Sequence, residues 1–360
     1  MLRILNVLLI SASSIGFIAV PLAAEVHVGG TLDSGGRWDQ GHSPYVVDRT
    51  LLIPRRARLF IGPGTTILIS PKKNTSKMPA DSEGEGGIAI IVKGTLTCAG
   101  TIGKRIRFMP SAIGEGSVGW HGIEFRGAGE GNEIAYTDIT GAQDGITVSE
   151  CRPLIRAAVI ERNNIGVNCR RLGSATLKNC VLTGNFVAAI RVAGANPVIE
   201  NCLIENNPGS GLWGDGNSVV GCSYNCISGN GDGNYLDCDP QLGRMAALNR
   251  NGDSVDKAGN LACDPAFAGT MADSLARERY LARSKTAKVG NFEKVKRRML
   301  DFADLVIHGS MKRPAPAKED AGRFSLSPYS PCRNAGDPAP KFNNADGSRN
   351  DMGIYGGPGK

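Results

Sequence analysis

The sequence predicts an all-β chain folded as a single-stranded right-handed parallel β-helix, a solenoid with coils of about 22 residues. Three observations lead to this prediction: residue types that recur at a fixed interval, short stretches with period-two alternation, and the composition. Glycine is frequent, at 48 residues, while aromatic residues make up only 6% of the chain. Such a composition suits many short strands and turns better than long helices.

The repeat is visible in three columns of the sequence. An interval of 22 positions separates the members of two sets, Asn163, Asn185 and Asn207, and Ile155, Leu177 and Ile199. A register of small residues advances in steps of 21 to 23 through Gly122, Gly145, Gly166, Ala189, Gly211 and Gly233. An interval near 22 is one coil of a β-helix, so we predict stacked coils from about Leu51 to Tyr235.

Each coil contains short alternating segments, seen at Ile146-Thr147-Val148, Val167-Asn168-Cys169 and Ile190-Arg191-Val192. In a strand the first and third of these side chains share one face and the middle one lies on the other. Burying the first set between coils stabilises the fold by about 1.5–3 kcal/mol per large aliphatic side chain. One coil alone has no core, so each coil depends on its neighbours.

Two further columns concern asparagine and cysteine. Asn179, Asn201 and Asn225 are expected at one turn position, because asparagine tolerates left-handed backbone and can hydrogen-bond to neighbouring coils. The residues that follow them, Cys180, Cys202 and Cys226, are expected to stack as small buried side chains. Cys169 takes a position that valine holds in other coils.

All ten cysteines lie beyond residue 24. Spacing alone leaves their connectivity open, and stacked neighbours could also be bridged. Cys238 and Cys263 both stand in a Cys-Asp-Pro context on either side of one loop, so they are the preferred disulfide pair.

Residues 1–24 have the features of a secretory signal: Arg3, an apolar run over 4–20, and small residues at Ala23 and Ala24. We therefore expect an exported protein of the periplasm or cell exterior. No later segment has the roughly 18 apolar residues of a membrane span. The remaining organisation is a β-helix with an N-terminal cap over 25–268, an insert over 269–323 and a closing segment over 324–360.

The insert is expected to be helical and basic. Apolar residues recur in it at helical spacing, at Phe292, Val295, Met299, Phe302 and Val306. Between Ser274 and Arg323 there are thirteen Lys or Arg against six acidic residues, a net charge of +7 that equals the net charge of the whole chain. The insert should therefore dominate binding to an anionic partner.

Several segments resemble one family. Ile61-Gly-Pro-Gly-Thr-Thr-Ile67 and Trp120-His-Gly-Ile-Glu-Phe125 resemble the cap and first coils of bacterial exported β-helix repeat proteins of the pectate-lyase-like superfamily. The end of the chain, from Ser330-Pro-Cys-Arg-Asn-Ala-Gly-Asp to Met352-Gly-Ile-Tyr-Gly-Gly, is similar to their closing segment, with Asn334 where the family usually has Asp. The resemblance implies this fold and export, while activities in the family vary among lyases, hydrolases and epimerases.

The resemblance also directs attention to Arg152-Pro-Leu-Ile-Arg156, a near match to the pectate lyase pattern Arg-x-Pro-x-x-Arg. In register, the first arginine of that pattern would fall at Cys151, so the residue resembling the catalytic base is missing. Arg156 is then expected to be an exposed coil residue, and the catalytic residues remain unknown.

The candidate binding site is the outward row of the first strand of each coil, where members of this family place glycans. The glycine register puts in that row Glu124, Thr147, Asn168, Arg191, Trp213 and Tyr235. Arg191 beside two aromatic faces suits a sugar with a carboxylate, because the rings offer apolar faces and the guanidinium a bidentate donor. The alternative is that the insert packs over Trp213 and Tyr235.

No metal site or cofactor is expected, since the four histidines lack ligand spacing. Calcium stays open as an alternative in the Asp- and Asn-rich stretches 232–253 and 344–351, although neither has a complete calcium-loop pattern. The favoured function is recognition of polysaccharide, including acidic polymers, without a catalytic set. A polysaccharide lyase or related enzyme and a structural surface rod are the alternatives. No nucleic acid partner is expected, and the oligomeric state is not determined.

Overall fold

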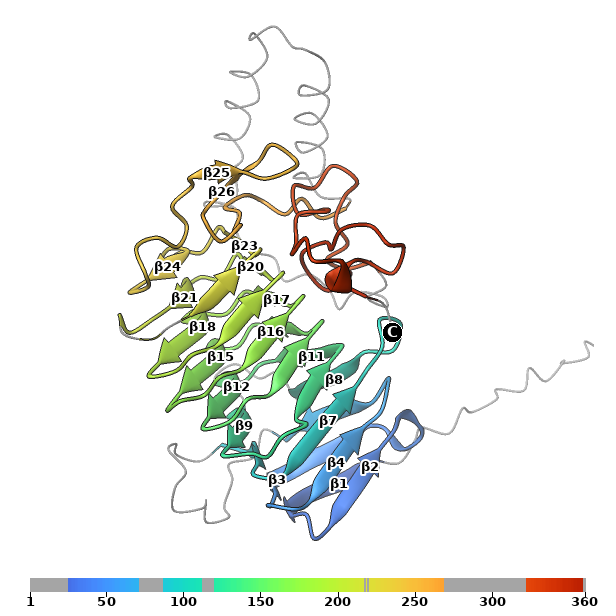
Figure 1. Cartoon of the computed structure of the whole chain (residues 1–360). Coiled ribbons are helices and arrows are strands. Elements are labelled where there is room, and N and C mark those ends of the chain that lie inside the picture. Colours follow the sequence, from blue (N-terminus) through green and yellow to red (C-terminus); the bar gives the residue numbers. More distant parts are fainter. Residues whose placement is uncertain are drawn as a thin grey trace, which may run out of the picture.

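The computed structural model describes residues 25–70, 87–111, 120–216, 218, 220–268 and 322–358. The predicted signal at 1–24, and the predicted helical insert except for its last two residues, lie outside the described residues. Figure 1 shows the described chain as a tall stack of strands that rises from the blue N-terminal part to the yellow coils. The only helical elements in the described ranges are two short 3-10 helices, η1 (Gln40–His42) and η3 (Pro340–Phe342).

The stack has three parallel walls, here called the first, second and third sheets; the first and third are the two arms of one 16-stranded sheet, and the second is an 8-stranded sheet. The first sheet contains β6 (Ala89–Val92), β9 (Gly122–Arg126), β12 (Asp144–Ser149), β15 (Ile165–Arg170), β18 (Ala188–Ala193), β21 (Ser210–Trp213) and β24 (Tyr235–Leu236). The second sheet contains β2 (Gly35–Trp38), β4 (Arg58–Ile61), β7 (Thr95–Ala99), β10 (Glu133–Ala135), β13 (Leu154–Arg156), β16 (Thr176–Lys178), β19 (Val198–Glu200) and β22 (Gly221–Ser223).

The third sheet contains β5 (Thr66–Ile69), β8 (Ile106–Pro110), β11 (Thr137–Thr140), β14 (Val159–Glu161), β17 (Val181–Thr183), β20 (Leu203–Glu205) and β23 (Cys226–Ser228). The long strand β3 (Tyr45–Ile53) joins the first and third sheets, because its first half pairs with β5 and its second half with β6. Strand β1 (Val26–Thr31) pairs with β3, and β25 (Ala247–Leu248) and β26 (Ser254–Val255) form an antiparallel hairpin above the last coil. The predicted all-β, coiled parallel architecture is confirmed.

The core is a set of aliphatic columns inside the stack. In the first sheet the inward column contains Ile90, Ile123, Ile146, Val167, Ile190 and Leu212, each aligned with the next and almost completely buried. Ile155, Leu177 and Ile199 form the corresponding column of the second sheet. The predicted interval of 22 residues therefore does correspond to one coil.

An asparagine ladder runs along the turn between the third and first sheets. Asn163, Asn185, Asn207 and Asn230 are buried and aligned, and the Nδ2 of each of the first three donates to Oδ1 of the next at 2.8–3.1 Å. Their side-chain oxygens also accept the backbone N–H of the preceding member, so the ladder satisfies polar groups that face the interior.

A second ladder follows the turn between the second and third sheets, and sulfur takes part in it. The backbone N–H of Cys180 donates to Sγ of Cys202 at 3.4 Å. The N–H of Cys202 donates to Oδ1 of Asn225 at 2.9 Å, and that of Asn225 to Oδ1 of Asn260 at 3.0 Å. Cys180 and Cys202 are stacked and buried, as predicted, and Cys169 lies between Val148 and Val192 in the valine column.

The predicted place of Asn225 and Cys226 in these columns is wrong by one residue. The turn residue with left-handed backbone is Asn179 (φ 52°), then Asn201 (φ 57°), then Tyr224 (φ 54°). In the next coil Asn225 instead takes the position that corresponds to Cys202, with its amide inside the coil. Cys226 pairs with Leu203 on the outer face of the third sheet.

The interval at this coil is 23, one more than the 22 of the preceding coil and one less than the 24 by which Asn225 and Cys226 were assigned. From Ile190 to Ile199 the connection between the first and second sheets takes nine positions, whereas the aligned connection from Leu212 to Cys222 takes ten. Every later strand residue is therefore displaced by one relative to an interval of 22. Because side chains alternate along a strand, a displacement of one moves a residue to the opposite face.

The chain then returns to cover the third sheet from outside. Val159, Val181, Leu203 and Cys226 form an outward apolar row, against which lie Val255, Leu261, Cys332, Ala335, Met352 and Ile354. Asn179 holds this closing segment through its Nδ2, which donates to the carbonyl oxygens of Asp351 and Gly353 at 3.0 and 3.2 Å. The turn asparagines thus bind the closing segment in addition to shaping the backbone.

All ten cysteines are free thiols, and the predicted pair of Cys238 with Cys263 is wrong. The Sγ of Cys238 donates to the carbonyl oxygen of Leu236 at 3.2 Å, while the Sγ of Cys263 lies 3.9 Å from that of Cys226. Cys226 faces Cys263 because the one-residue displacement places Cys226 on the outer face. Within the described ranges, no helix has the length and apolar character required to cross a membrane.

Candidate functional site

The predicted outer row of the first sheet is present as a continuous line of aligned residues. Glu124 pairs with Thr147, Thr147 with Asn168, Asn168 with Arg191, and Arg191 with Trp213. Each residue stands between two inward core residues, which is why the alternation in the sequence located it correctly. Their positions are confirmed, and their role in binding stays a prediction.

Tyr235 does not belong to this row, so its predicted position is wrong. It pairs with Leu212, and the neighbour of Trp213 in the next coil is Leu236. Tyr235 packs against the core, and no hydrogen-bond partner for its hydroxyl exists among the described residues. The additional residue between Leu212 and Cys222 causes this displacement, because it makes the interval at this coil 23 instead of 22.

The lower part of the row is polar and closely packed. Asp144, which the sequence reasoning missed, accepts hydrogen bonds from Asn168 Nδ2 at 2.7 Å and Thr147 Oγ1 at 3.1 Å. Glu124 forms an ion pair with Arg126, whose Nε donates to Glu124 Oε2 at 2.7 Å. Thr147 is 3% and Asn168 7% exposed, so these groups mainly hold one another in place.

The upper part of the row combines an aromatic ring with a cation. The guanidinium carbon of Arg191 lies 4.7 Å from the centroid of the Trp213 ring, and both side chains are half-buried. This contact orders the guanidinium, and a cation over an indole contributes about 0.5–2 kcal/mol. An ordered guanidinium can donate two parallel hydrogen bonds to a carboxylate, and the indole offers an apolar surface beside it.

The segment that resembles the pectate lyase pattern lies elsewhere. Arg156 is on β13 of the second sheet, half-buried instead of exposed, where its Nε donates to Glu133 Oε1 at 2.6 Å. Its guanidinium also lies 5.5 Å from the Tyr136 ring centroid. Cys151 is buried, and burial raises the pKa of its thiol. Arg156 therefore serves an ion pair on a wall remote from the outer row of the first sheet.

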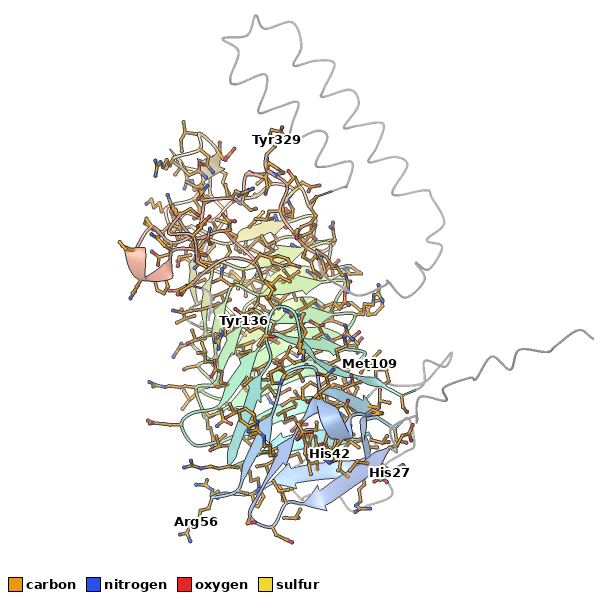
Figure 2. All side chains as sticks on the ribbon, turned by 90° about the vertical axis from the view of Figure 1, so that its right-hand side faces the viewer. His27, His42, Arg56, Met109, Tyr136 and Tyr329 are labelled. Carbon is orange, nitrogen blue, oxygen red and sulfur yellow. The ribbon has the colours of Figure 1, made fainter. Side chains whose placement is uncertain are left out.

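The Asp- and Asn-rich loops use their oxygens for turns. Asp239 Oδ1 accepts the backbone N–H of Gln241 at 2.9 Å, and Asp346 Oδ1 accepts that of Ser348 at 2.9 Å. His27 and His42 lie at the N-terminal end of the stack (Figure 2), and each forms a contact with an aspartate, Asp48 and Asp39 respectively. In the part of the chain that is described, no three His, Cys, Asp or Glu side chains are grouped as a metal site.

Two buried carboxylates on the third sheet were not found from the sequence. Glu161 is held by Arg323, which donates from Nη1 to Oε1 at 3.0 Å and from Nη2 to Oε2 at 2.5 Å. Glu205, two coils further along the same outer row, is 6% exposed. Burial, and secondly the charge of Asp264, raise the pKa of Glu205 to about 7. The signal in the sequence was a Glu at the last position of each of two aligned strands. A Glu at a strand end is also the ordinary pattern of an exposed residue, so it did not indicate a buried carboxylate.

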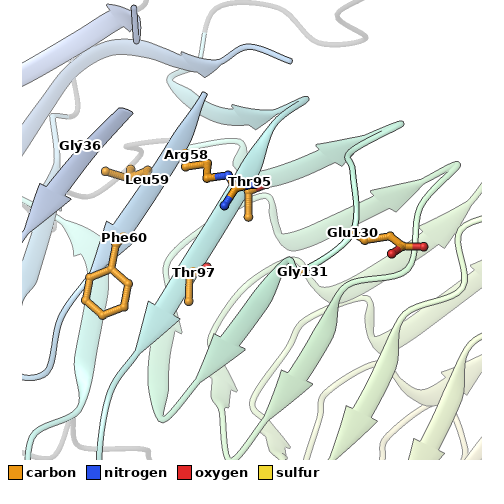
Figure 3. Close-up of a pocket in the computed structure, with 8 residues that line it drawn as sticks. All are labelled: Gly36, Arg58, Leu59, Phe60, Thr95, Thr97, Glu130 and Gly131. Carbon is orange, nitrogen blue, oxygen red and sulfur yellow. The ribbon is translucent and has the colours of Figure 1, made fainter. Parts of the chain in front are cut away.

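A hollow of about 620 Å³ opens on the second sheet near the N-terminal end (Figure 3). Strands β4 and β7 line it with Arg58, Phe60, Thr95 and Thr97, and the loop before β10 adds Glu130. Its lining has one guanidinium and one carboxylate, so it lacks the pair of carboxylates that glycoside hydrolysis requires. The outer row of the first sheet extends over five coils, and its accessible part is Arg191 and Trp213, because Glu124, Thr147 and Asn168 are buried.

The fold defines the class of protein: the coils, the parallel walls and the asparagine ladder are those of a parallel β-helix. Residues 106–243 match the family model described as the right handed beta helix region. Neither a curated protein nor a solved structure matches this chain. The architecture is therefore a right-handed parallel β-helix, and the comparisons carry no assignment of activity.

Proposed function

We propose that this protein is exported and recognises polysaccharide, including acidic polymers, on the outer face of its first sheet. The observation that carries the proposal is the guanidinium of Arg191 held over the Trp213 ring at 4.7 Å. Asn168 lies in the adjacent coil, in line with Arg191. Adjacent coils are about 4.8 Å apart, close to the length of a sugar ring, so an extended chain can contact successive coils. Export rests on the signal-like residues 1–24.

Recognition is favoured over catalysis because the carboxylates of the row are engaged. Glu124 is paired with Arg126, and Asp144 accepts from Asn168 and Thr147. A general base must have a lone pair directed at the proton that it removes. Carboxylates engaged in this way are better suited to holding neighbouring side chains than to proton abstraction. A lyase and a purely structural rod remain as outcomes of the test.

A glycan array with neutral and uronate-containing oligosaccharides tests the proposal. Trp213→Ala should abolish binding to both kinds, while Arg191→Ala should weaken the uronate-containing ones selectively, because only these offer a carboxylate to the guanidinium. Phe186→Ala is the matched control, since Phe186 is an aromatic residue that is 61% exposed outside the row. The melting temperature of each variant should stay close to that of the unmodified protein.

Other results decide against the proposal. If Trp213→Ala lowers the melting temperature and leaves binding intact, the residue supports the scaffold. If no glycan binds, the structural rod is favoured. Release of unsaturated uronate absorbance from an acidic polymer would indicate a lyase.

A further inference from the structure

Three thiols meet where the closing segment covers the third sheet. Cys226 belongs to the last coil, Cys263 to the segment after the β25–β26 hairpin, and Cys332 to the closing segment. All three belong to the apolar contact between the outer face of the third sheet and the segments that cover it. Cys226 and Cys332 are buried there, and Cys263 is partly exposed. The cluster therefore joins three parts of the chain that are separate in sequence.

The thiols of this cluster lie within hydrogen-bonding distance of one another and are not covalently bonded. The Sγ atoms of Cys226 and Cys263 are 3.9 Å apart, and the thiol of Cys226 also donates to the carbonyl oxygen of Cys263 at 2.8 Å. The thiol of Cys332 interacts with both. A disulfide requires a sulfur separation near 2.05 Å, so the sulfur atoms of Cys226 and Cys263 must approach by about 1.9 Å to join.

Cys263 has the environment of a reactive cysteine. The neighbouring thiols of Cys226 and Cys332 lower the pKa of Cys263 below that of an ordinary thiol, whereas the pKa values of Cys226 and Cys332 are raised well above the ordinary range. Reactive cysteines combine a stabilised thiolate with partial exposure. Cys263 has both, and it is therefore the thiol of this cluster that an external reagent reaches first.

The stacked pair Cys180 and Cys202 differs from this cluster in exposure: the pKa of the Cys180 thiol is also lowered, but no sulfur of the pair reaches solvent. Both side chains are fully buried inside the coil. The Sγ of Cys202 accepts the backbone N–H of Cys180, and the thiol of Cys180 donates to the carbonyl oxygen of Lys178 at 3.4 Å. A disulfide there would remove a bond of the turn ladder and has no exposed sulfur through which to form.

We propose that the cluster of Cys226, Cys263 and Cys332 is a thiol–disulfide exchange site, at which a small disulfide such as oxidised glutathione drives formation of a bond between Cys263 and Cys226. The Cys263 thiolate attacks one sulfur of the reagent, forms a mixed disulfide and releases one glutathione thiolate. The sulfur of Cys226 then attacks Cys263 Sγ, loses its proton and releases the second. Two protein thiols are oxidised and one glutathione disulfide is reduced. The proton of Cys226, together with the proton that Cys263 lost to solvent on ionisation, balances the two glutathione thiolates.

The product would tie the last coil to the segment that follows the hairpin. The loop closed by this bond spans 37 positions. Closing such a loop lowers the entropy of the unfolded chain and so stabilises the end of the stack, where the described residues include no further coil. Cys332 stays a thiol and donates to the reacting sulfur.

The test is oxidation of the full chain with oxidised glutathione, followed by peptide mapping without reduction. We expect a single intrachain disulfide between Cys226 and Cys263, and a higher urea midpoint of the oxidised protein. Cys263→Ser should abolish both the mixed disulfide and the bond, while Cys98→Ser, which removes a buried thiol of the coil, should leave them unchanged. A bond between other cysteines, or none, would overturn the proposal.

A second measurement covers the case in which Cys263→Ser does not fold. Iodoacetamide alkylation of the unmodified protein, mapped at short times, should label Cys263 first, with a rate that reaches half its maximum at a pH clearly below that of an ordinary thiol. Cys332→Ser keeps a hydrogen-bond donor and should retain this profile, whereas Cys332→Ala should shift it to higher pH. First labelling at another cysteine, or an ordinary profile at Cys263, contradicts the assignment.

Discussion

The asparagine ladder offers the sharpest test of how the stack is held together, and Asn185→Ala is the substitution of choice. Asn185 is fully buried in the middle of the ladder. Its Oδ1 accepts the backbone N–H of Asn163 at 3.2 Å, and its Nδ2 donates to the carbonyl oxygen of Ile160 at 3.1 Å. Alanine removes both contacts and leaves these two buried backbone groups without this partner.

The expected loss follows from those two groups. An unsatisfied buried donor or acceptor costs about 1–3 kcal/mol, so Asn185→Ala should lower the free energy of unfolding by about 2–6 kcal/mol. Urea unfolding followed by circular dichroism measures the change. Asn164→Ala is the matched control, because Asn164 is the exposed neighbour of a ladder residue, and it should change stability by less than about 0.5 kcal/mol. Equal effects of the two substitutions would refute the reasoning.

Three further predictions concern the core, a carboxylate and a turn. Ile199→Asp should lower the free energy of unfolding by more than about 4 kcal/mol, since it buries an unpaired charge, whereas Ile199→Val should cost only about 0.5–1.5 kcal/mol; similar urea midpoints would contradict this. The pKa of Glu205 is raised from 4.5 to about 7, so folding favours the protonated side chain. The contribution of this preference to the free energy of unfolding is fully present below pH 4.5 and is lost as the pH rises through 7. Glu205→Gln should therefore stabilise the protein by about 3 kcal/mol at pH 8, at about 1.4 kcal/mol per pH unit, and have little effect at pH 4; a pH-independent difference in melting temperature would argue against it. Asn179→Gly should be milder than Asn179→Ala in thermal unfolding, because only glycine adopts a φ of 52° without strain, and the reverse order would exclude this explanation.

The prediction from sequence succeeded where a residue's face depends only on its neighbours in the strand. Thr147, Asn168 and Arg191 were placed outward because each stands between two aliphatic or small apolar residues. This alternation is local, so it survives small changes in coil length. The columns of the core and the asparagine ladder at Asn163 and Asn185 follow from the same regular interval.

The prediction failed beyond a connection whose length changed. Asn225, Cys226 and Tyr235 were assigned by adding the interval of 22–24 to an earlier position. The connection from Leu212 to Cys222 has one more residue than the connection from Ile190 to Ile199. The residue types in that loop do not indicate which position is the additional one. Strand pairing in space, and not the count along the chain, decides which residues are aligned.

The candidate site was therefore found in part. Arg191 and Trp213 were placed together, but Asp144 and Arg126, which order the lower part of the row, were missed. Both belong to strands whose other residues fit the pattern well. Their partners are residues two or more positions away or in the next coil, so only the folded geometry identifies them.

The sequence by itself determined the coil length, the all-β architecture and the outward row up to Trp213, because solenoid coils repeat local patterns and burial requires alternation. The tertiary structure alone decided the displacement of the last coil, the cover of the third sheet and the meeting of Cys226, Cys263 and Cys332. The displacement follows from one additional residue in a loop, and the other two features depend on contacts between segments 37 to more than 100 positions apart. A repeat with an interval of 22 contains no information on such contacts. They form because later segments of the chain bury the apolar side chains that the coils leave on their outer face.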